Sequence, residues 1–133
     1  MVSYRTPRSR AAGLGTAKEG VHTWIAERVS AIALVPLSLW AVYAALRLAP
    51  MGYDQAILWL QHPLNTVLAV LFAALAFYHM GMGLRVVIED YIHRRSTLIF
   101  LLLLNAFVWW GMGTATIVAL LKIALGTSVG ALV

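Results

Sequence analysis

The residues of this chain best suited to chemistry lie between His79 and Tyr91, where a long apolar run ends in charged side chains. Each residue of an α-helix turns by about 100°, so His79, Gly83 and Asp90 share one face, and Tyr91 follows at its polar end. An ionisable group inside a membrane costs roughly 2.5 kcal/mol or more, which makes His79 a candidate functional residue. Its imidazole could ligate a metal, and a carboxylate beside a phenol could bind or protonate a polar ligand.

The absence of cysteine limits the metal chemistry that this chain can support. Disulfides, thiolate zinc sites and cysteine-ligated iron–sulfur clusters are excluded, which leaves histidine as the metal ligand. We therefore predict that His79 ligates the iron of a haem and that Asp90 and Tyr91 border a second site near the surface. The alternative is a neutral histidine hydrogen-bonded across a helix interface. Gly81 and Gly83 fit both interpretations, because missing side chains make room for a macrocycle or for a close helix.

A haem iron with two axial imidazoles needs a second histidine at the depth of His79, about 18 Å from Tyr91 along a helix. His62 belongs to the outer side of the membrane, and His22 and His93 belong to the inner surface. The sequence therefore predicts that the second ligand comes from another chain and that this protein is a subunit.

The composition is that of a membrane protein. Of 133 residues, 62% are hydrophobic and only 11% are charged, with a mean hydropathy of +0.83. A soluble domain this short could not bury so much apolar surface, whereas a bilayer accepts it. We predict an all-α integral membrane protein with three transmembrane helices near residues 29–48, 64–90 and 97–121.

Shorter segments connect and flank these spans. Tyr53–Leu60 is expected to form a short interfacial helix, ended by His62 and Pro63. The remaining predicted boundaries are a mobile basic arm over residues 1–20, one membrane domain over residues 21–125 and a tail over residues 126–133.

The positive charges predict the orientation in the membrane. Lys and Arg gather before the first span and between the second and third, whereas the other two ends hold only Arg47 and Lys122. Since cytoplasmic loops carry the excess of positive charge, we predict a cytoplasmic N-terminus and a periplasmic C-terminus. The net charge of +5 then suits anionic lipid headgroups, and no nucleic-acid partner is predicted.

This orientation gathers polar candidates at the cytoplasmic surface. His22 and Arg28 could reach the anionic propionates of a haem or the edge of a cofactor, or Arg28 could simply anchor the span in the positive-inside pattern. Asp90 and Tyr91 could hydrogen-bond and protonate a carbonyl-bearing ligand, or they could only end their helix in water. Spacing alone favours the second interpretation for each pair.

Two blocks of sequence together resemble a known family. The first is Gly20-Val21-His22 followed by Arg28, Ser30 and Ala31; the second is His79 with Gly83 and Asp90-Tyr91. They resemble the D-type hydrophobic membrane anchor subunit of bacterial succinate dehydrogenase, the succinate:quinone oxidoreductase of respiratory complex II. The run from Glu89 to His93 is similar to the alphaproteobacterial and mitochondrial branch, and the resemblance covers nearly the whole chain.

The resemblance implies a haem b shared with a C-type cytochrome b anchor subunit, with His79 as one axial ligand. It also implies that Tyr91 and Asp90 line a quinone site, for which ubiquinone is the expected substrate, and that Arg28 and His22 lie near the propionates. Succinate would be oxidised on a flavoprotein subunit, and electrons would cross an iron–sulfur subunit. This chain would then carry no succinate chemistry itself, and its location would be the bacterial inner membrane.

Other functions fit the same sequence. A quinol:fumarate reductase anchor would differ in its quinone and in the direction of the reaction. A small transporter or channel subunit would use His79 as a proton relay. An assembly protein would use His79 only for packing.

Overall fold

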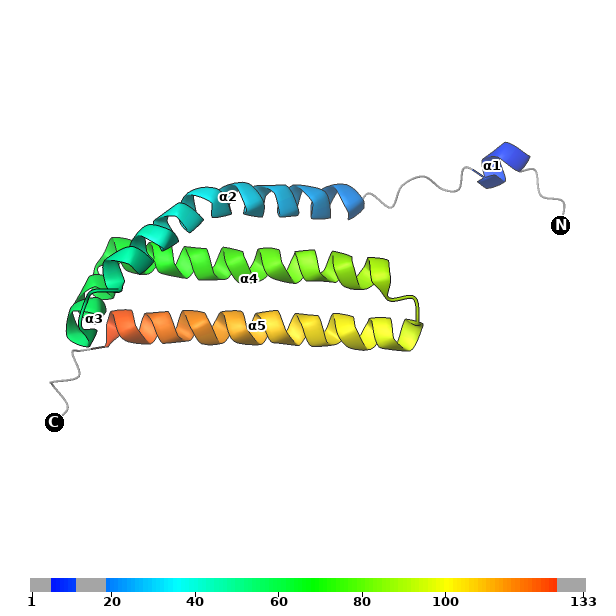
Figure 1. Cartoon of the computed structure of the whole chain (residues 1–133). Coiled ribbons are helices and arrows are strands. Elements are labelled where there is room, and N and C mark those ends of the chain that lie inside the picture. The colour runs from blue at the N-terminus through cyan, green and yellow to red at the C-terminus, as the bar shows by residue number, and fades with distance from the viewer. Residues whose placement is uncertain (1–5, 12–18, 127–133) are drawn as a thin grey trace.

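The computed structural model describes residues 6–11 and 19–126, and the remaining residues of the predicted arm and tail lie outside this part. Its helices are α1 (Pro7–Ala11), α2 (Glu19–Leu48), α3 (Tyr53–Gln61), α4 (Pro63–Tyr91) and α5 (Arg95–Leu125) (Figure 1). The part of the chain that is described contains no strand. The prediction of an all-α protein is therefore confirmed.

Three of these helices are long and apolar enough to cross a membrane, as predicted: Gly20–Leu48, Pro63–Tyr91 and Arg95–Leu125. A helix of 29 residues is about 44 Å long, which covers the hydrocarbon core and both headgroup layers. Helix α2 starts at Glu19, whereas the first span predicted from the sequence starts near residue 29. Nothing between residues 19 and 29 interrupts a helix as proline would, so the polar segment before the first apolar run continues the same helix.

Proline shapes the helices at two places. Pro36 lies inside α2, and Figure 1 shows that this helix bends in its middle part. A bend is expected there because proline lacks the backbone N–H group and its ring crowds the preceding turn. Pro63 is the first residue of α4, and the preceding His62 has an extended backbone (φ −61°, ψ 126°). This confirms the predicted end of the short helix α3, because the residue before a proline is driven away from helical angles.

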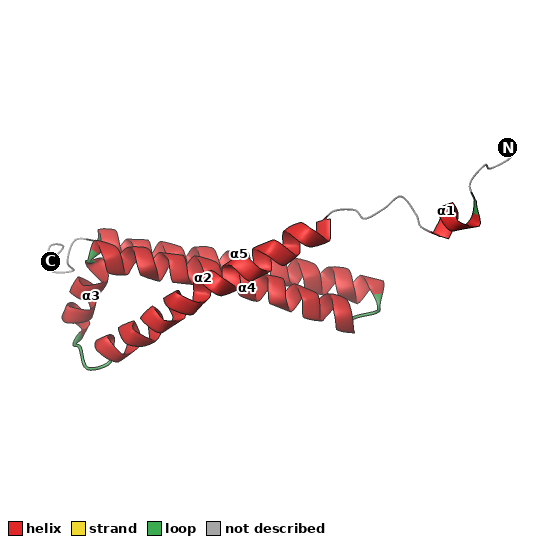
Figure 2. Ribbon diagram, turned by 90° about the horizontal axis from the view of Figure 1, so that it is seen from above, coloured by secondary structure: helices red, strands yellow, loops and turns green. Residues whose placement is uncertain are grey.

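Helix α4 lies at the centre of the arrangement. Helices α2 and α5 each pack against it, and α3 contacts both α4 and α5 at the end of the molecule where α5 ends. Figure 2 shows α2 crossing obliquely over the α4–α5 pair. Gln61 at the end of α3 donates to the carbonyl oxygens of Ile123 and Gly126, at 3.1 and 2.8 Å, and so ties α3 to the end of α5.

The helices meet through small residues. In the described residues the buried apolar positions are Ala44, Ala69, Ala73 and Ile88, together with Gly81 and Gly113. Large apolar side chains lie instead on the outside; Leu125 is 82% exposed. Small residues let membrane helices approach closely, while lipid or partner chains cover the outer surface. This pattern is therefore the one expected of a membrane-embedded protein.

Helices α4 and α5 make a close contact at Gly81. A Cβ atom at this position would lie 2.6 Å from Cδ1 and 2.7 Å from Cγ of Trp109. The buried Asn105, also on α5, donates from Nδ2 to the Gly81 carbonyl oxygen at 3.0 Å. Gly81 is therefore required by helix packing within this chain.

We expect Gly81→Ala to weaken the α4–α5 contact by about 1–3 kcal/mol, because overpacking forces backbone or side chains to shift. The Trp109 atoms that the new methyl would meet lie near the root of the side chain and cannot swing away cheaply. The measurement is the thermal midpoint of the purified membrane complex. Gly111→Ala, which adds a methyl with nothing within 4 Å, is the matched control and should leave the midpoint unchanged or slightly raised.

Candidate functional site

His79 and Ser30 connect α4 to α2. The Nδ1 atom of His79 lies 3.0 Å from the Oγ atom of Ser30, and the same Oγ lies 2.9 Å from the backbone carbonyl oxygen of Glu27. Ser30 is only 2% exposed. The polar half of the His79 ring that faces α2 is therefore bonded inside this chain.

The other ring nitrogen of His79, Nε2, has no hydrogen-bond partner among the described residues. His79 is half-buried, and every buried side-chain nitrogen or oxygen in that part of the chain has a partner. Nε2 must therefore keep some accessible surface. It is the nitrogen through which His79 can bind a group from outside this chain.

The two glycines near His79 have different surroundings. The Trp109 side chain occupies the space beside Gly81, whereas a Cβ atom added at Gly83 would have nothing within 4 Å. The sequence left two explanations open for both glycines, and the structure separates them. Within this chain, close helix packing explains Gly81, while Gly83 leaves open space one turn from His79.

Asp90 and Tyr91 lie at the C-terminal end of α4, and the backbone becomes extended at Ile92. Both are exposed, Tyr91 to 76%. Neither side chain has a hydrogen bond or ion pair within residues 6–11 and 19–126. Their polar atoms are available to a ligand or to another subunit.

His22 and Arg28 lie on different sides of α2. The Arg28 guanidinium lies 5.6 Å from the centroid of the Trp24 ring, a cation–π contact, and no carboxylate of the described residues pairs with it. His22 is exposed and faces a pocket that Arg28 does not line. The structure therefore does not place these two side chains together.

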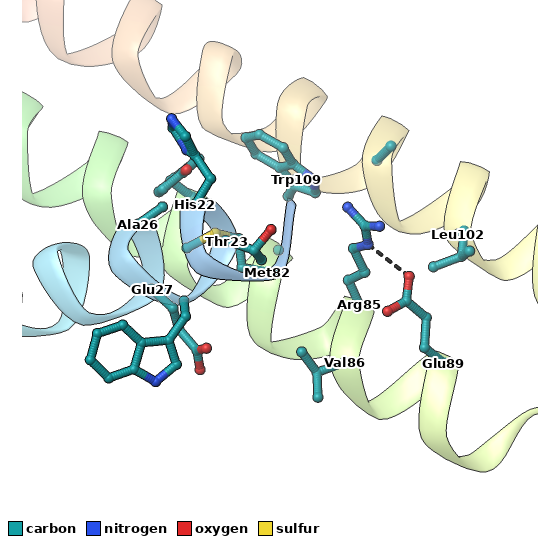
Figure 3. A pocket seen from close by; sticks show the side chains of 15 residues that line it. His22, Thr23, Ala26, Glu27, Met82, Arg85, Val86, Glu89, Leu102 and Trp109 are labelled. Carbon is teal, nitrogen blue, oxygen red and sulfur yellow. Dashed lines mark hydrogen bonds and ion pairs between the residues drawn. The ribbon is translucent and has the colours of Figure 1, made fainter. Parts of the chain in front are cut away.

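That pocket has a volume of about 750 Å³ and lies between the first half of α2, the second half of α4 and the first half of α5. Figure 3 shows His22 toward one end, the Arg85–Glu89 ion pair (2.8 Å) toward the other, and Trp109 between them. Of the site residues predicted from the sequence, only His22 lines it. The other predicted residues do not line this pocket.

No group of three or more His, Asp or Glu side chains that could hold a metal ion occurs in the described ranges. A metal at His79 would therefore take fewer than three such ligands from this part of the chain.

Sequence reasoning missed three residues that shape this region. Ser30 entered only as part of a resemblance, although a hydroxyl inside an apolar run signals an interhelical hydrogen bond. Asn105 is likewise a lone amide in the apolar run of α5, and it supports Gly81. Trp109 lies in the same apolar run, where tryptophan commonly marks an aromatic belt, but it packs on Gly81 and meets Tyr78 edge-on with ring centroids 6.1 Å apart.

The amino-acid sequence is similar to that of a known protein family and of named relatives. Residues 2–112 match the model of the family described as succinate dehydrogenase/fumarate reductase transmembrane subunit. A protein of Paracoccus denitrificans named succinate dehydrogenase hydrophobic membrane anchor subunit is 32% identical over 130 residues, covering 95% of this chain and 97% of its own length. No solved structure matches the chain.

Two rickettsial proteins carry the same name. The Rickettsia conorii protein is 38% identical over 103 residues, covering 74% of this chain and 82% of its own length. The Rickettsia bellii protein is 36% identical over 99 residues, covering 72% and 79%. With the family match over most of its length and three apolar helices packed through small residues, the chain belongs to the succinate dehydrogenase/fumarate reductase transmembrane subunit family.

Proposed function

We propose that this chain is the hydrophobic membrane anchor subunit of a succinate:quinone oxidoreductase and shares a haem b and a quinone-reduction site with a partner anchor subunit. The family match and the names of the relatives support the anchor role. Those names also favour succinate oxidation over fumarate reduction. The observation that carries the haem proposal is the ring of His79, which is bonded through Nδ1 and keeps Nε2 without a partner in the described part of the chain.

The residues around His79 fit a haem. One nitrogen of the imidazole can bind iron, and the open space at Gly83 leaves room on the same helix face. Arg28, which has no carboxylate partner among the described residues, suits an anionic propionate. His22 lines a pocket that Arg28 does not line, so its assignment to the propionates is supported by the family resemblance alone. A bound haem supplies one-electron transfer. Since this chain offers one histidine at that depth, a second histidine ligand would come from the C-type partner.

Tyr91 and Asp90 are assigned to the quinone site. Their polar atoms have no partner in the residues that the structure describes, and they lie where α4 ends. The tyrosine hydroxyl can donate a hydrogen bond to a quinone carbonyl, and Asp90 can hold the local network or pass on a proton. The iron–sulfur subunit docks beside this end and delivers electrons that the flavoprotein subunit takes from succinate.

The anchor role is tested by deleting this chain in its host. Dye-linked succinate oxidation is expected to remain but to move from the membrane to the soluble fraction, because the flavin and clusters lie on other subunits. Succinate:quinone activity should disappear and return when the wild-type chain is restored. Membranes that retain succinate:quinone activity without this chain would contradict the proposal.

The orientation is proposed from the distribution of Lys and Arg, with the N-terminus in the cytoplasm and the C-terminus in the periplasm. A reporter that is active only in the periplasm, fused after residue 126, should be active. The same reporter fused after Ile92, between α4 and α5, should be silent. The opposite pattern would reverse the proposed topology and move Tyr91 to the other side.

A further inference from the structure

We infer that Ser30 is a positioning residue that fixes the tautomer of His79, with the proton on Nδ1 and the lone pair on Nε2. This inference rests on the proposed function, in which His79 ligates the haem iron. It concerns an atom pair within this chain, Ser30 Oγ and His79 Nδ1, 3.0 Å apart.

The hydroxyl of Ser30 has one proton and two neighbours. The carbonyl oxygen of Glu27, at 2.9 Å, can only accept, so it takes this proton. Ser30 Oγ is then left as an acceptor toward His79, and Nδ1 must be the donor. In the opposite tautomer the hydroxyl proton would turn to Nδ1, and two oxygen atoms would face each other at 2.9 Å without a proton between them.

The burial of Ser30 makes this choice strict. The residue is 2% exposed, so water cannot easily replace a missing donor or acceptor around its hydroxyl. The only pattern that makes both contacts of Ser30 into hydrogen bonds runs from His79 Nδ1–H to Ser30 Oγ and from Ser30 O–H to the Glu27 carbonyl oxygen. Each bond in such a chain polarises the next, which makes the hydroxyl a better acceptor.

This pattern prepares Nε2 to bind a metal. With the proton on Nδ1, Nε2 carries the lone pair, and it is the ring nitrogen that keeps accessible surface. Metal-bound histidines usually donate their other N–H to an acceptor, which fixes the ring and raises the basicity of the ligand. A histidine used only for packing needs neither a fixed tautomer nor an open Nε2.

The inference is tested in the intact complex with Ser30→Ala and Ser30→Thr, because threonine keeps the hydroxyl. The readouts are the midpoint potential of the haem and the electron paramagnetic resonance spectrum of its ferric form. In Ser30→Ala, the His79 Nδ1–H group loses its acceptor and the His79 ring becomes less basic. The preference of the haem iron for the ferric state should then fall by about tenfold. For a one-electron couple this raises the potential by ~59 mV. Ser30→Thr should stay close to wild type.

Ser38→Ala removes an exposed hydroxyl from the same helix and is the matched control. If Ser30→Ala loses the haem altogether, retention of haem by Ser30→Thr supports the inference, and loss in both variants overturns it. A Ser30→Ala complex with the potential and ferric spectrum of Ser38→Ala also overturns it. In that case a changed spectrum in His79→Ala would leave the ligand proposal intact, whereas an unchanged one would remove the ligand proposal itself.

Discussion

Replacing Tyr91 by phenylalanine should slow succinate:quinone reduction by roughly 10²-fold or more while succinate oxidation by an artificial dye continues at the wild-type rate. In the proposed quinone site, the tyrosine hydroxyl would donate a hydrogen bond to the quinone carbonyl, on which negative charge develops during reduction. Removing one preorganised donor of this kind typically costs on the order of 10²-fold in rate. Because Tyr91 is 76% exposed at the end of α4, its hydroxyl contributes little to folding of this chain.

The control is Tyr53→Phe, which removes a similarly exposed hydroxyl (70%) from the first residue of α3, beyond the opposite end of α4. It should leave both activities unchanged. Equal loss of quinone and dye activity in Tyr91→Phe would indicate failed assembly. Wild-type quinone turnover in an assembled Tyr91→Phe complex would exclude Tyr91 from the site.

The sequence was sufficient for the main architecture. Runs of uncharged residues long enough for a bilayer predicted the three spans, and His62 followed by Pro63 predicted the break between α3 and α4. These features depend on local chemistry, namely hydrophobic length and the backbone limits of proline. Helix α2 begins ten residues before the predicted first span, because hydropathy reports where lipid begins and not where a helix begins.

The contacts of the site could not be predicted in the same way. The 3.6-residue period placed His79 and Gly83 on one face, but it cannot tell which helix that face meets. The hydrogen bond between His79 and Ser30 depends on how α2 crosses α4. The contact of Trp109 with Gly81 depends on how α5 is aligned along α4. Both are tertiary features, set by packing between segments far apart in sequence.

Replacing His79 by alanine should lower the haem content of the complex and change its spectrum. In the proposed site the substitution would remove one of two haem ligands, while a histidine of the C-type partner would still hold part of the haem. The matched control is Met80→Ala, one residue further along α4, whose side chain is 50% exposed and has no role in the proposed site. It should keep the wild-type haem content, because the proposed haem ligand is the ring of His79, which this substitution leaves in place.

The most direct measurement is the reduced-minus-oxidised absorption spectrum of the complex purified through a tag on this chain, in wild type, His79→Ala and Met80→Ala. We expect a b-type spectrum of equal intensity in wild type and Met80→Ala, and a weaker or shifted spectrum in His79→Ala at the same flavin content. A wild-type complex without b-type absorbance, or a His79→Ala complex with the wild-type spectrum and potential, would contradict a haem held by this chain.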